Sequence, residues 1–351
     1  MPQLLATLLH ISDLHVGVPD AQTGDAVLSP LVSAAYQHCT WLDGLLGHHS
    51  QALEDLEEFL ENELRSKNED PHIVITGDLT RVGDAAELQL AQQYIDSAIV
   101  LGTPTVGRLT GLAANGSSTA IPGNHDHWGG TPPPSGGAGS TAYAQMALNL
   151  PDVVYPPVTL SNGRQLVFIR VDSDADVPAR SLHRTLAIGE FLHHIQAALP
   201  LQAPAPEEVR VMLIHHSWAQ SGVFLRMGTA SKAALGRLLQ QHGITVVLTG
   251  HAHGPWMAPI LAGSGAGSGP VYELRCGTTT QYDVLPKTWL YRATQALPGF
   301  QQPPRPGNTL IVHRLRELDD GTWWHATVYG RGPKGHFKAL SAPNAELMFK
   351  V

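Results

Sequence analysis

The chain has 351 residues, of which 43% are apolar and 15% are charged, and its formal net charge is −8. This apolar fraction suffices to bury a core, which excludes a disordered chain. The acidic balance and the lack of a basic run argue against stable nucleic-acid binding, because contacts to phosphate backbones need clustered Lys and Arg.

Cysteine usage and the first residues indicate a cytoplasmic protein without a membrane partner. Only Cys39 and Cys276 are present, too few for a disulfide framework, so we expect free thiols. The first residues have no basic region or cleavage site of a signal peptide and are expected to form a first strand. No stretch approaches the roughly 18 apolar residues of a membrane helix.

Short apolar runs alternate with helical patterns along most of the chain. Six runs rich in Val, Ile and Leu are typical of buried strands: Leu4–Ile11, His72–Thr76, Gln165–Val171, Val209–Ile214, Ile244–Thr249 and Val271–Arg275. Helices are predicted at Leu53–Leu64, Ala85–Val100 and Leu186–Leu199. The alternation predicts an α/β protein with sheets buried on at least one face.

The carboxyl-terminal part differs from this pattern. Two β-rich runs, Asn308–Leu318 and Thr322–Tyr329, are joined by Asp-Asp-Gly and predict a hairpin over residues 308–330. Three Gly-, Ser- or Pro-rich stretches are expected to be loops: Gly129–Ser140, Ala262–Pro270 and Pro298–Asn308. They are either tolerated surface insertions or a rim over a substrate site. Without repeats or an interdomain linker, residues 1–351 are expected to form one domain.

Polar metal-binding side chains follow five strand runs. In chain order the segments are SDLH (Asp13, His15), TGDLT (Asp78), PGNHD (Asn124, His125, Asp126), IHHS (His215, His216) and TGHAH (His251, His253). The carboxyl edge of a sheet is where α/β proteins place their sites. In an extended D-x-H or H-x-H segment the two side chains would point to one face and could hold one ion. Five such segments together predict a metal site.

The motifs SDLH, GDLT, GNHD, HH and GHAH, in this order, resemble the calcineurin-like metallophosphoesterases. The resemblance implies a four-layer αββα sandwich of two mixed β-sheets flanked by helices, with the 308–330 hairpin extending one sheet. GDLT followed by Gly83 and Glu87, then PGNHD and a double His, is most similar to class III cyclic-nucleotide and glycerophosphodiester phosphodiesterases. Ser217 departs from the proline that these enzymes often have after the double His.

The resemblance also implies a centre of two metal ions. Asp13, His15, Asp78 and His253 would hold one ion, and Asp78, Asn124, His215 and His251 the other, with Asp78 as the bridge. Oxygen and imidazole ligands without thiolate suit transition metals; we expect Fe or Mn, with Zn or Co as alternatives. His125 would contact the phosphoryl group and protonate the leaving group, and Asp126 would orient its other ring nitrogen.

Other residues near the motifs leave alternatives open. His216 is either next to the ligands, or facing the substrate, or a packing residue, since neighbouring side chains on a strand point in opposite directions. His10 and His127 are expected to be structural. His48, His49, His193 and His194 are expected at the surface. Asp172 in the segment VDSD and the segment CGT at Cys276–Thr278 resemble further family elements that do not bind metal.

The sequence therefore predicts a metal-dependent phosphoesterase that hydrolyses a phosphodiester or phosphomonoester with a metal-bridging hydroxide. A small-molecule substrate, such as a nucleotide or a glycerophosphodiester, is favoured. The alternatives are a nuclease of the same superfamily and a binding scaffold that keeps the fold without hydrolysis. Metal identity, ester preference and oligomeric state are not predicted.

Overall fold

The computed structural model describes residues 2–17, 47–96, 109–114, 117–131, 157–198, 205–263, 269–280, 307–332, 334–342 and 344–351. Cys39 and most of the three Gly-, Ser- or Pro-rich stretches lie outside these residues, as does the predicted helical end at 97–100. Cys276 is described and is a buried free thiol, as expected.

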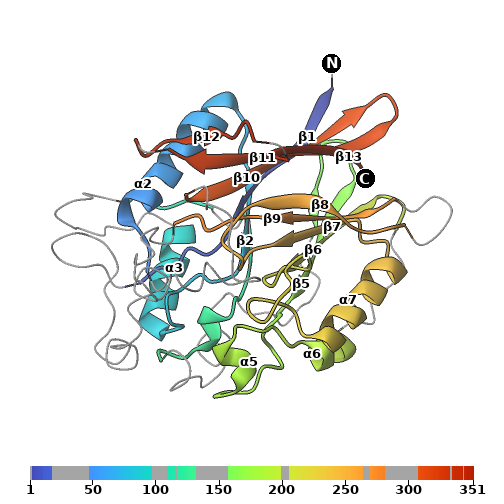
Figure 1. The fold of residues 1–351 in the computed structure, drawn as a ribbon. Helices are drawn as coiled ribbons and strands as arrows, with labels where there is room; N and C mark the ends of the chain where they lie inside the picture. Colours follow the sequence, from blue (N-terminus) through green and yellow to red (C-terminus); the bar gives the residue numbers. More distant parts are fainter. Residues whose placement is uncertain are drawn as a thin grey trace.

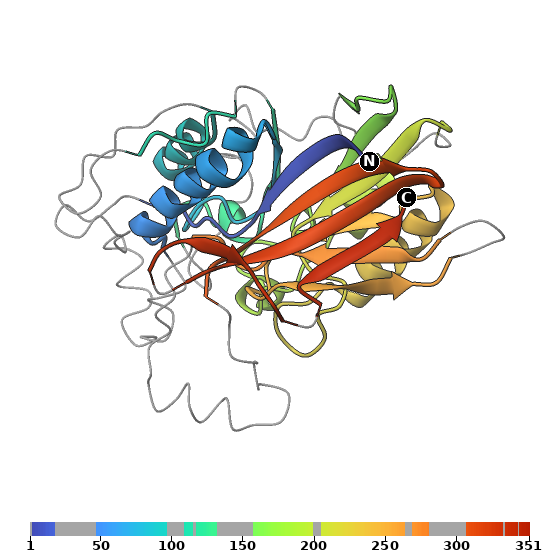
Figure 2. The same cartoon turned by 90° about the horizontal axis from the view of Figure 1, so that it is seen from above.

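The first sheet has seven strands and is mixed (Figure 1). Its path runs β12-β11-β10-β1-β2-β3, and β13 pairs with β11. The pairs β1·β2 and β2·β3 are parallel, whereas β1·β10 and β10·β11 are antiparallel. The strands are β1 (Gln3–Ile11), β2 (His72–Thr76), β3 (Ser118–Ile121), β10 (Thr309–Leu318), β11 (Gly321–Arg331), β12 (Phe337–Ala339) and β13 (Glu346–Lys350). Figure 2 shows the long β10–β11 hairpin lying beside β1.

The second sheet has six strands in the order β4-β5-β6-β7-β9-β8. Its four central strands are parallel to their neighbours, and β4 and β8 pair antiparallel at the two edges. The strands are β4 (Val158–Thr159), β5 (Gln165–Val171), β6 (Glu208–Ile214), β7 (Val246–Thr249), β8 (Trp256–Leu261) and β9 (Val271–Arg275). Four of them, β5, β6, β7 and β9, follow the predicted bounds within two residues, and so do β1 and β2 of the first sheet.

The two sheets pack face to face between helices, which gives the four-layer αββα sandwich expected from the motifs. In each strand successive side chains point to opposite faces, so Leu8 of β1 enters the core between the sheets while Leu9 enters the core under the helices. Phe168 and Ile169 of β5 divide in the same way between the central core and the core of the other helical layer. Both sheets are therefore buried on two faces.

Helices cover the outer face of each sheet (Figure 1). On the first sheet lie α2 (Ser50–Phe59), continued by a π-helical turn (Leu60–Leu64) and a 3₁₀ turn (Arg65–Lys67), and α3 (Ala85–Asp96). On the second lie α6 (Leu192–Ala198) and α7 (Thr229–Gln241). Among the described residues, no helix has the length and apolar character needed to cross a bilayer.

The predicted helix at Leu186–Leu199 was wrong in its first half. A short helix, α5 (Leu182–Thr185), ends before it, and α6 begins only at Leu192. Ala187 between them has a left-handed backbone with φ of 49°, which interrupts a right-handed helix. The apolar periodicity of the sequence continues through the segment that contains Ala187, although this segment is not helical. It contacts the site described below.

Candidate metal centre

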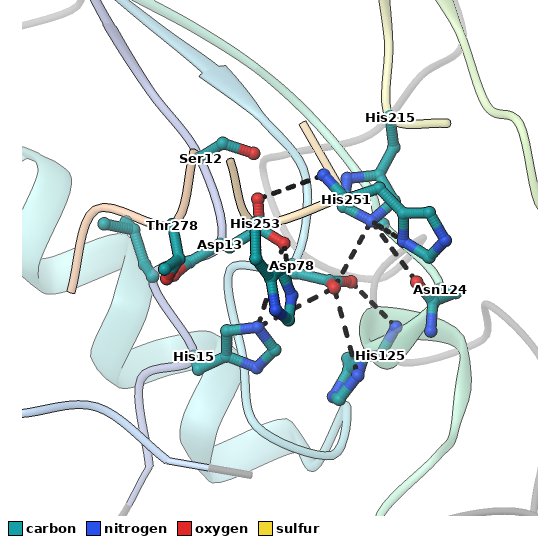
Figure 3. Close-up of polar contacts among 12 residues, drawn as sticks. Ser12, Asp13, His15, Asp78, Asn124, His125, His215, His251, His253 and Thr278 are labelled. Carbon is teal, nitrogen blue, oxygen red and sulfur yellow. Dashed lines mark hydrogen bonds and ion pairs between the residues drawn. The ribbon is translucent and has the colours of Figure 1, made fainter. Parts of the chain in front are cut away.

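Five strands end at one edge of the sandwich, and the side chains that follow them converge there (Figure 3). Asp13 and His15 follow β1, Asp78 follows β2, and Asn124 and His125 follow β3 in the first sheet. His215 follows β6, and His251 and His253 follow β7 in the second. The structure thus brings all seven predicted ligands together from both sheets.

Asp13, His15 and His253 form one group that could hold a metal ion. His253 Nε2 lies 3.2 Å from Asp13 Oδ1, and His15 Nε2 lies 3.9 Å from the same oxygen. His15 Nε2 is also 3.8 Å from Asp78 Oδ2. Asp78 thereby adjoins this group as well as the next one.

Asp78, His215 and His251 form a second group of this kind. His215 Nε2 lies 3.3 Å from Asp78 Oδ2, 3.3 Å from the Oδ1 atom of Asn124 and 3.1 Å from His251 Nδ1. The other ring nitrogens face backbone carbonyls, since His215 Nδ1 is 2.6 Å from Thr76 O and His251 Nε2 is 3.3 Å from Ala187 O. With the outer nitrogens as donors, the inner nitrogens keep their lone pairs for an ion.

The buried polar atoms of the cluster fit metal ions. Asp13 Oδ1, Asp78 Oδ2 and His15 Nε2 have no hydrogen-bond partner within the described part of the chain. All three side chains are at most 1% exposed, and buried polar atoms are normally satisfied. A mixed carboxylate, amide and imidazole set suits transition metals better than Ca²⁺.

Electrostatics support the same conclusion. Burial lowers the pKa of His15 to about 3, which keeps this imidazole neutral and able to bind a cation. Burial opposes charge on Asp78 too, but the imidazoles of His215 and His125 hold its pKa well below the usual range. Burial also lowers the pKa of His215, and Asp78 outweighs it, so that this pKa rises to about 10. Asp78 is thus a buried anion that is stabilised by positive charge beside it.

The sequence predicts extended ligand segments, but in the structure these segments are turns. Asp13, His15, Asp78, His251 and His253 all have left-handed backbones, with φ between 49° and 69°. Each follows the end of its strand rather than belonging to it. Asp13 and His15 share one group, but His251 and His253 fall in different groups, so the i, i+2 argument from an extended strand was wrong.

His125 lies at the open side of the cluster with its side chain 12% exposed. Its Nε2 points toward Asp78 Oδ2 at 4.0 Å, and its Nδ1 is 2.8 Å from the carbonyl oxygen of Arg81. Its backbone N–H donates to Asp78 Oδ1. With His15 and Asp78, His125 also forms a third group that could hold a metal ion, and it presents Nε2 to this cluster.

Asp126 does not orient His125, which corrects the prediction. Its carboxylate accepts hydrogen bonds from the backbone N–H groups of Leu79, Thr80 and Gly123 and from the Thr80 hydroxyl. The Arg81 carbonyl takes the expected place of the carboxylate beside His125. Asp126 instead fastens the loop after β3 to the loop that carries Asp78.

The histidines outside the ligand set have structural contacts. His216 is buried, and its Nδ1 lies 2.7 Å from Ser173 Oγ. His10 is buried beside Thr76 and His313. His127 pairs with Asp172 at 3.0 Å; burial lowers its pKa, but Asp172 outweighs burial and raises it to about 9. The expected surface position of His48 was wrong: it is fully buried, and its Nδ1 accepts from the Gly17 N–H.

Two supports of the centre were not predicted. Thr278 and Thr280 donate their hydroxyls to the carbonyls of Asp13 and Leu14, which holds the left-handed turn of the first ligand loop. Ala187 gives its carbonyl to His251. Thr278 lies in the CGT segment, which the sequence showed as a family element. The carbonyl of Ala187 could not be predicted, because every residue has a backbone carbonyl.

The sequence was compared with known families and proteins. The family model of calcineurin-like phosphoesterases matches residues 6–255. None of the curated proteins compared with the chain matches it significantly.

Solved structures with a similar arrangement include Vps29 from Entamoeba histolytica complexed with Zn²⁺, at 11% identity over 95% of this chain and 97% of that chain, with a TM-score of 0.32. Vps29 from Chaetomium thermophilum is 8% identical over 99% of this chain and 98% of that chain, with a TM-score of 0.37. A putative 5′-nucleotidase from Staphylococcus aureus in complex with α-ketoglutarate is 11% identical over 99% of this chain and 54% of that chain, with a TM-score of 0.35.

Proposed function

Because the chain belongs to the calcineurin-like phosphoesterase family, we propose that it hydrolyses a small phosphate ester at a centre of two transition-metal ions. The observation that carries this proposal is the pair of buried ligand groups on either side of Asp78. Two adjacent ions sharing a carboxylate would activate water as the nucleophile and offset the charge that develops on the phosphoryl oxygens.

The distances support the ligands that the family resemblance implies. Asp13, His15 and His253 would hold one ion and Asn124, His215 and His251 the other, with Asp78 between them. Asn124 adds an oxygen without adding charge, which limits repulsion against Asp78. We favour iron or manganese as the metal. Zn²⁺ or Co²⁺ would fit the same donors.

His125 is proposed as the general acid. The Arg81 carbonyl accepts the Nδ1–H of this ring, so Nε2 is the nitrogen that faces the substrate space. A protonated Nε2 there can give its proton to the departing alkoxide. Because Asp126 holds the loop and not the ring, its proposed part is to keep His125 at its distance from Asp78.

The substrate class is proposed from the motifs and the charge. GDLT with Gly83 and Glu87 favours the class III phosphodiesterases, and an acidic chain favours a small ester over nucleic acid. Ser217, the departure from that class, accepts a hydrogen bond from Arg275. The serine thus has a structural contact of its own, and it remains a departure from the class.

The proposal is tested with metal-defined protein and a substrate panel. The panel comprises bis-p-nitrophenyl phosphate, the p-nitrophenyl monoester, cyclic nucleotides and glycerophosphodiesters. We expect metal-dependent turnover of at least one diester and its loss on chelation. If the protein holds two ions and hydrolyses no ester of the panel, it would instead be a binding scaffold.

His125→Ala tests the acid. It should keep both ions, because His125 is proposed to bind neither, and slow hydrolysis of a glycerol ester by about 10²- to 10⁴-fold. The loss should be smaller for a p-nitrophenyl ester, since that leaving group departs without a proton. His325→Ala on the β10–β11 hairpin is the matched control. Loss of a metal ion would make His125 a ligand, and equal losses on both esters would make it a phosphate-positioning residue.

A further inference from the structure

Two motif loops at the centre lie against each other along their length. They are Gly77–Asp84, which carries the proposed bridging ligand, and Gly123–Gly130. Asp126 accepts hydrogen bonds from the first loop, and the N–H of Gly130 donates to Val82 O at 2.8 Å. The second loop thus returns to the first after passing His125, and the segment between these bonds is held at both ends.

Trp128 lies in that segment and covers the ring of His125. The two rings are stacked with centroids 3.7 Å apart and an interplanar angle of 27°. The 3₁₀ turn η4 (His125–His127) explains this contact, because side chains three residues apart eclipse one another in a 3₁₀ helix. The N–H of Trp128 donates to the carbonyl of His125 and closes the turn.

The indole contacts His125 through its face and not through a hydrogen bond. Trp128 is 7% exposed, and its Nε1–H finds no acceptor among the residues that the structure describes. A buried tryptophan N–H usually has a partner. Within the described residues, the contact of the indole that bears on the site is therefore its flat face over the His125 ring.

The remaining contacts of His125 show what this face adds. The Arg81 carbonyl fixes Nδ1, and His15 meets the ring edge-on with centroids 4.5 Å apart. A hydrogen bond at one nitrogen still permits the ring to tilt about that bond. The stacked indole removes this freedom, because a tilt would separate the two faces.

We propose that Trp128 is a positioning residue that holds the plane of the His125 imidazole, so that Nε2 meets the leaving-group oxygen. This rests on the proposed function in that His125 is the general acid. A positioning group acts on the step in which the proton moves and not on metal binding. Its removal should therefore resemble a weaker form of His125→Ala.

The experiment compares Trp128→Ala and Trp128→Phe with wild type, using a glycerol diester and a p-nitrophenyl diester. Trp323→Ala, on the β10–β11 hairpin, controls for the loss of an indole elsewhere. We expect Trp128→Ala to keep two ions and to lose about 10- to 100-fold in kcat on the glycerol ester, with a much smaller loss on the p-nitrophenyl ester. Trp128→Phe should restore most of the activity and be at least as stable as wild type, because it keeps the face and removes the unpaired donor.

A second measurement does not depend on turnover. The ring protons of His125, assigned by their absence in His125→Ala, should resonate upfield in the Zn²⁺-loaded protein because they lie over an indole, and should move downfield in Trp128→Ala. Equal losses on both esters, a Phe variant as poor as the Ala variant, or unmoved ring protons would overturn the proposal. If wild type hydrolyses no ester, the proposed function fails, and the proton shift alone decides whether the indole holds the ring.

Discussion

At the scale of single residues, the backbone conformation of the proposed ligands is the feature that sets the centre apart. Five of the seven have positive φ, namely Asp13, His15, Asp78, His251 and His253. Such conformations cost about 1–3 kcal/mol each and persist only where surrounding contacts hold them. Here the N–H groups of Asp13 and His15 donate to the carbonyls of Gly77 and Asp78, and His251 N–H donates to Asp13 Oδ2. Each loop is therefore held by another loop that carries a ligand.

Residue identities could be predicted from the sequence, whereas their geometry could not. Carboxylate and imidazole side chains seldom gather in such numbers after strands, which is why six of the seven proposed ligands could be named, and Asn124 came from the family resemblance. The partner of His125 was missed because it is a carbonyl oxygen, that of Arg81, and every residue has one. Asp126 was assigned to the ring because it is next in sequence, but its carboxylate faces the other loop.

Asp78→Asn tests the bridge. An amide has one oxygen and no charge, so it cannot serve two cations as a carboxylate does. We expect loss of activity and a fall in bound metal from two ions toward one or none, measured by elemental analysis. Asp70→Asn, at an exposed carboxylate, is the control and should change neither. Two tightly held ions and normal turnover in Asp78→Asn would contradict the assignment.

His251→Ala and His253→Ala test how the ligands divide. His253 lies beside Asp13 and His251 beside His215, so each variant should lose a different ion. Elemental analysis of the double variant distinguishes the cases. We expect each single variant to bind one ion and the double variant to bind none. A double variant that still binds one ion would place both histidines at the same ion.

At the scale of elements, the strands were predictable because they are buried on both faces and appear as continuous apolar runs. The strands that were missed lack this signal: β3, β4 and β12 have two to four residues, β8 contains Pro259, and in β13 one residue of five is buried. The error at Leu186–Leu199 has another cause. Ala187 turns left-handed and gives its carbonyl to His251, so the needs of the site override helix propensity there.

The close contact of the two motif loops explains Gly83. This residue has φ of +68°, and a Cβ atom there would lie 2.6 Å from the carbonyl oxygen of Asp126 and 2.8 Å from that of His125. Both values are too short for any side chain. The glycine is what allows the loop after Asp78 to lie against the backbone that carries the proposed acid.

Gly83→Ala should therefore be more harmful than its size suggests. The left-handed conformation costs about 1 kcal/mol for alanine, and the clash adds to it by pushing His125 from Asp78. We expect lower thermal stability and slower turnover with both ions retained. Gly163→Ala is a close control, since Gly163 has φ of +85° but open space around its Cβ position. Equal effects of the two substitutions would show that the clash has no consequence.

At the scale of the whole molecule, the centre joins the two halves of the sandwich. Asp13, His15, Asp78 and Asn124 follow strands of the seven-stranded sheet, and His215, His251 and His253 follow strands of the six-stranded one. His127 and Asp172 form a second polar link between the halves at the same edge. Away from this edge, the two sheets are held together by the apolar core between them. Binding of cations is thus expected to tie the edge where the strands of both sheets end.

Removal of metal tests this expectation. A ligand that binds only the folded chain stabilises it by about 2.7 kcal/mol when its free concentration is one hundred times Kd. Two ions at such concentrations give about 5 kcal/mol, and for a domain of this size we expect chelation to lower Tm by roughly 5–10 °C. Returning the metal should restore Tm, which separates this effect from irreversible damage.

Asp78→Asn should show a smaller change in Tm on chelation than wild type, because the variant has already lost one or both ions, whereas Asp70→Asn should respond as wild type does. Without ions the buried carboxylates of Asp13 and Asp78 face each other with less compensation, so the chelated protein should open first where β1, β2 and β7 end. Hydrogen exchange measures this directly: faster exchange at the N–H groups of Asp13, His15 and His251 is expected before any change in the central strands. A Tm and an exchange pattern that do not respond to metal would show that the apolar core alone holds the two sheets together at this edge.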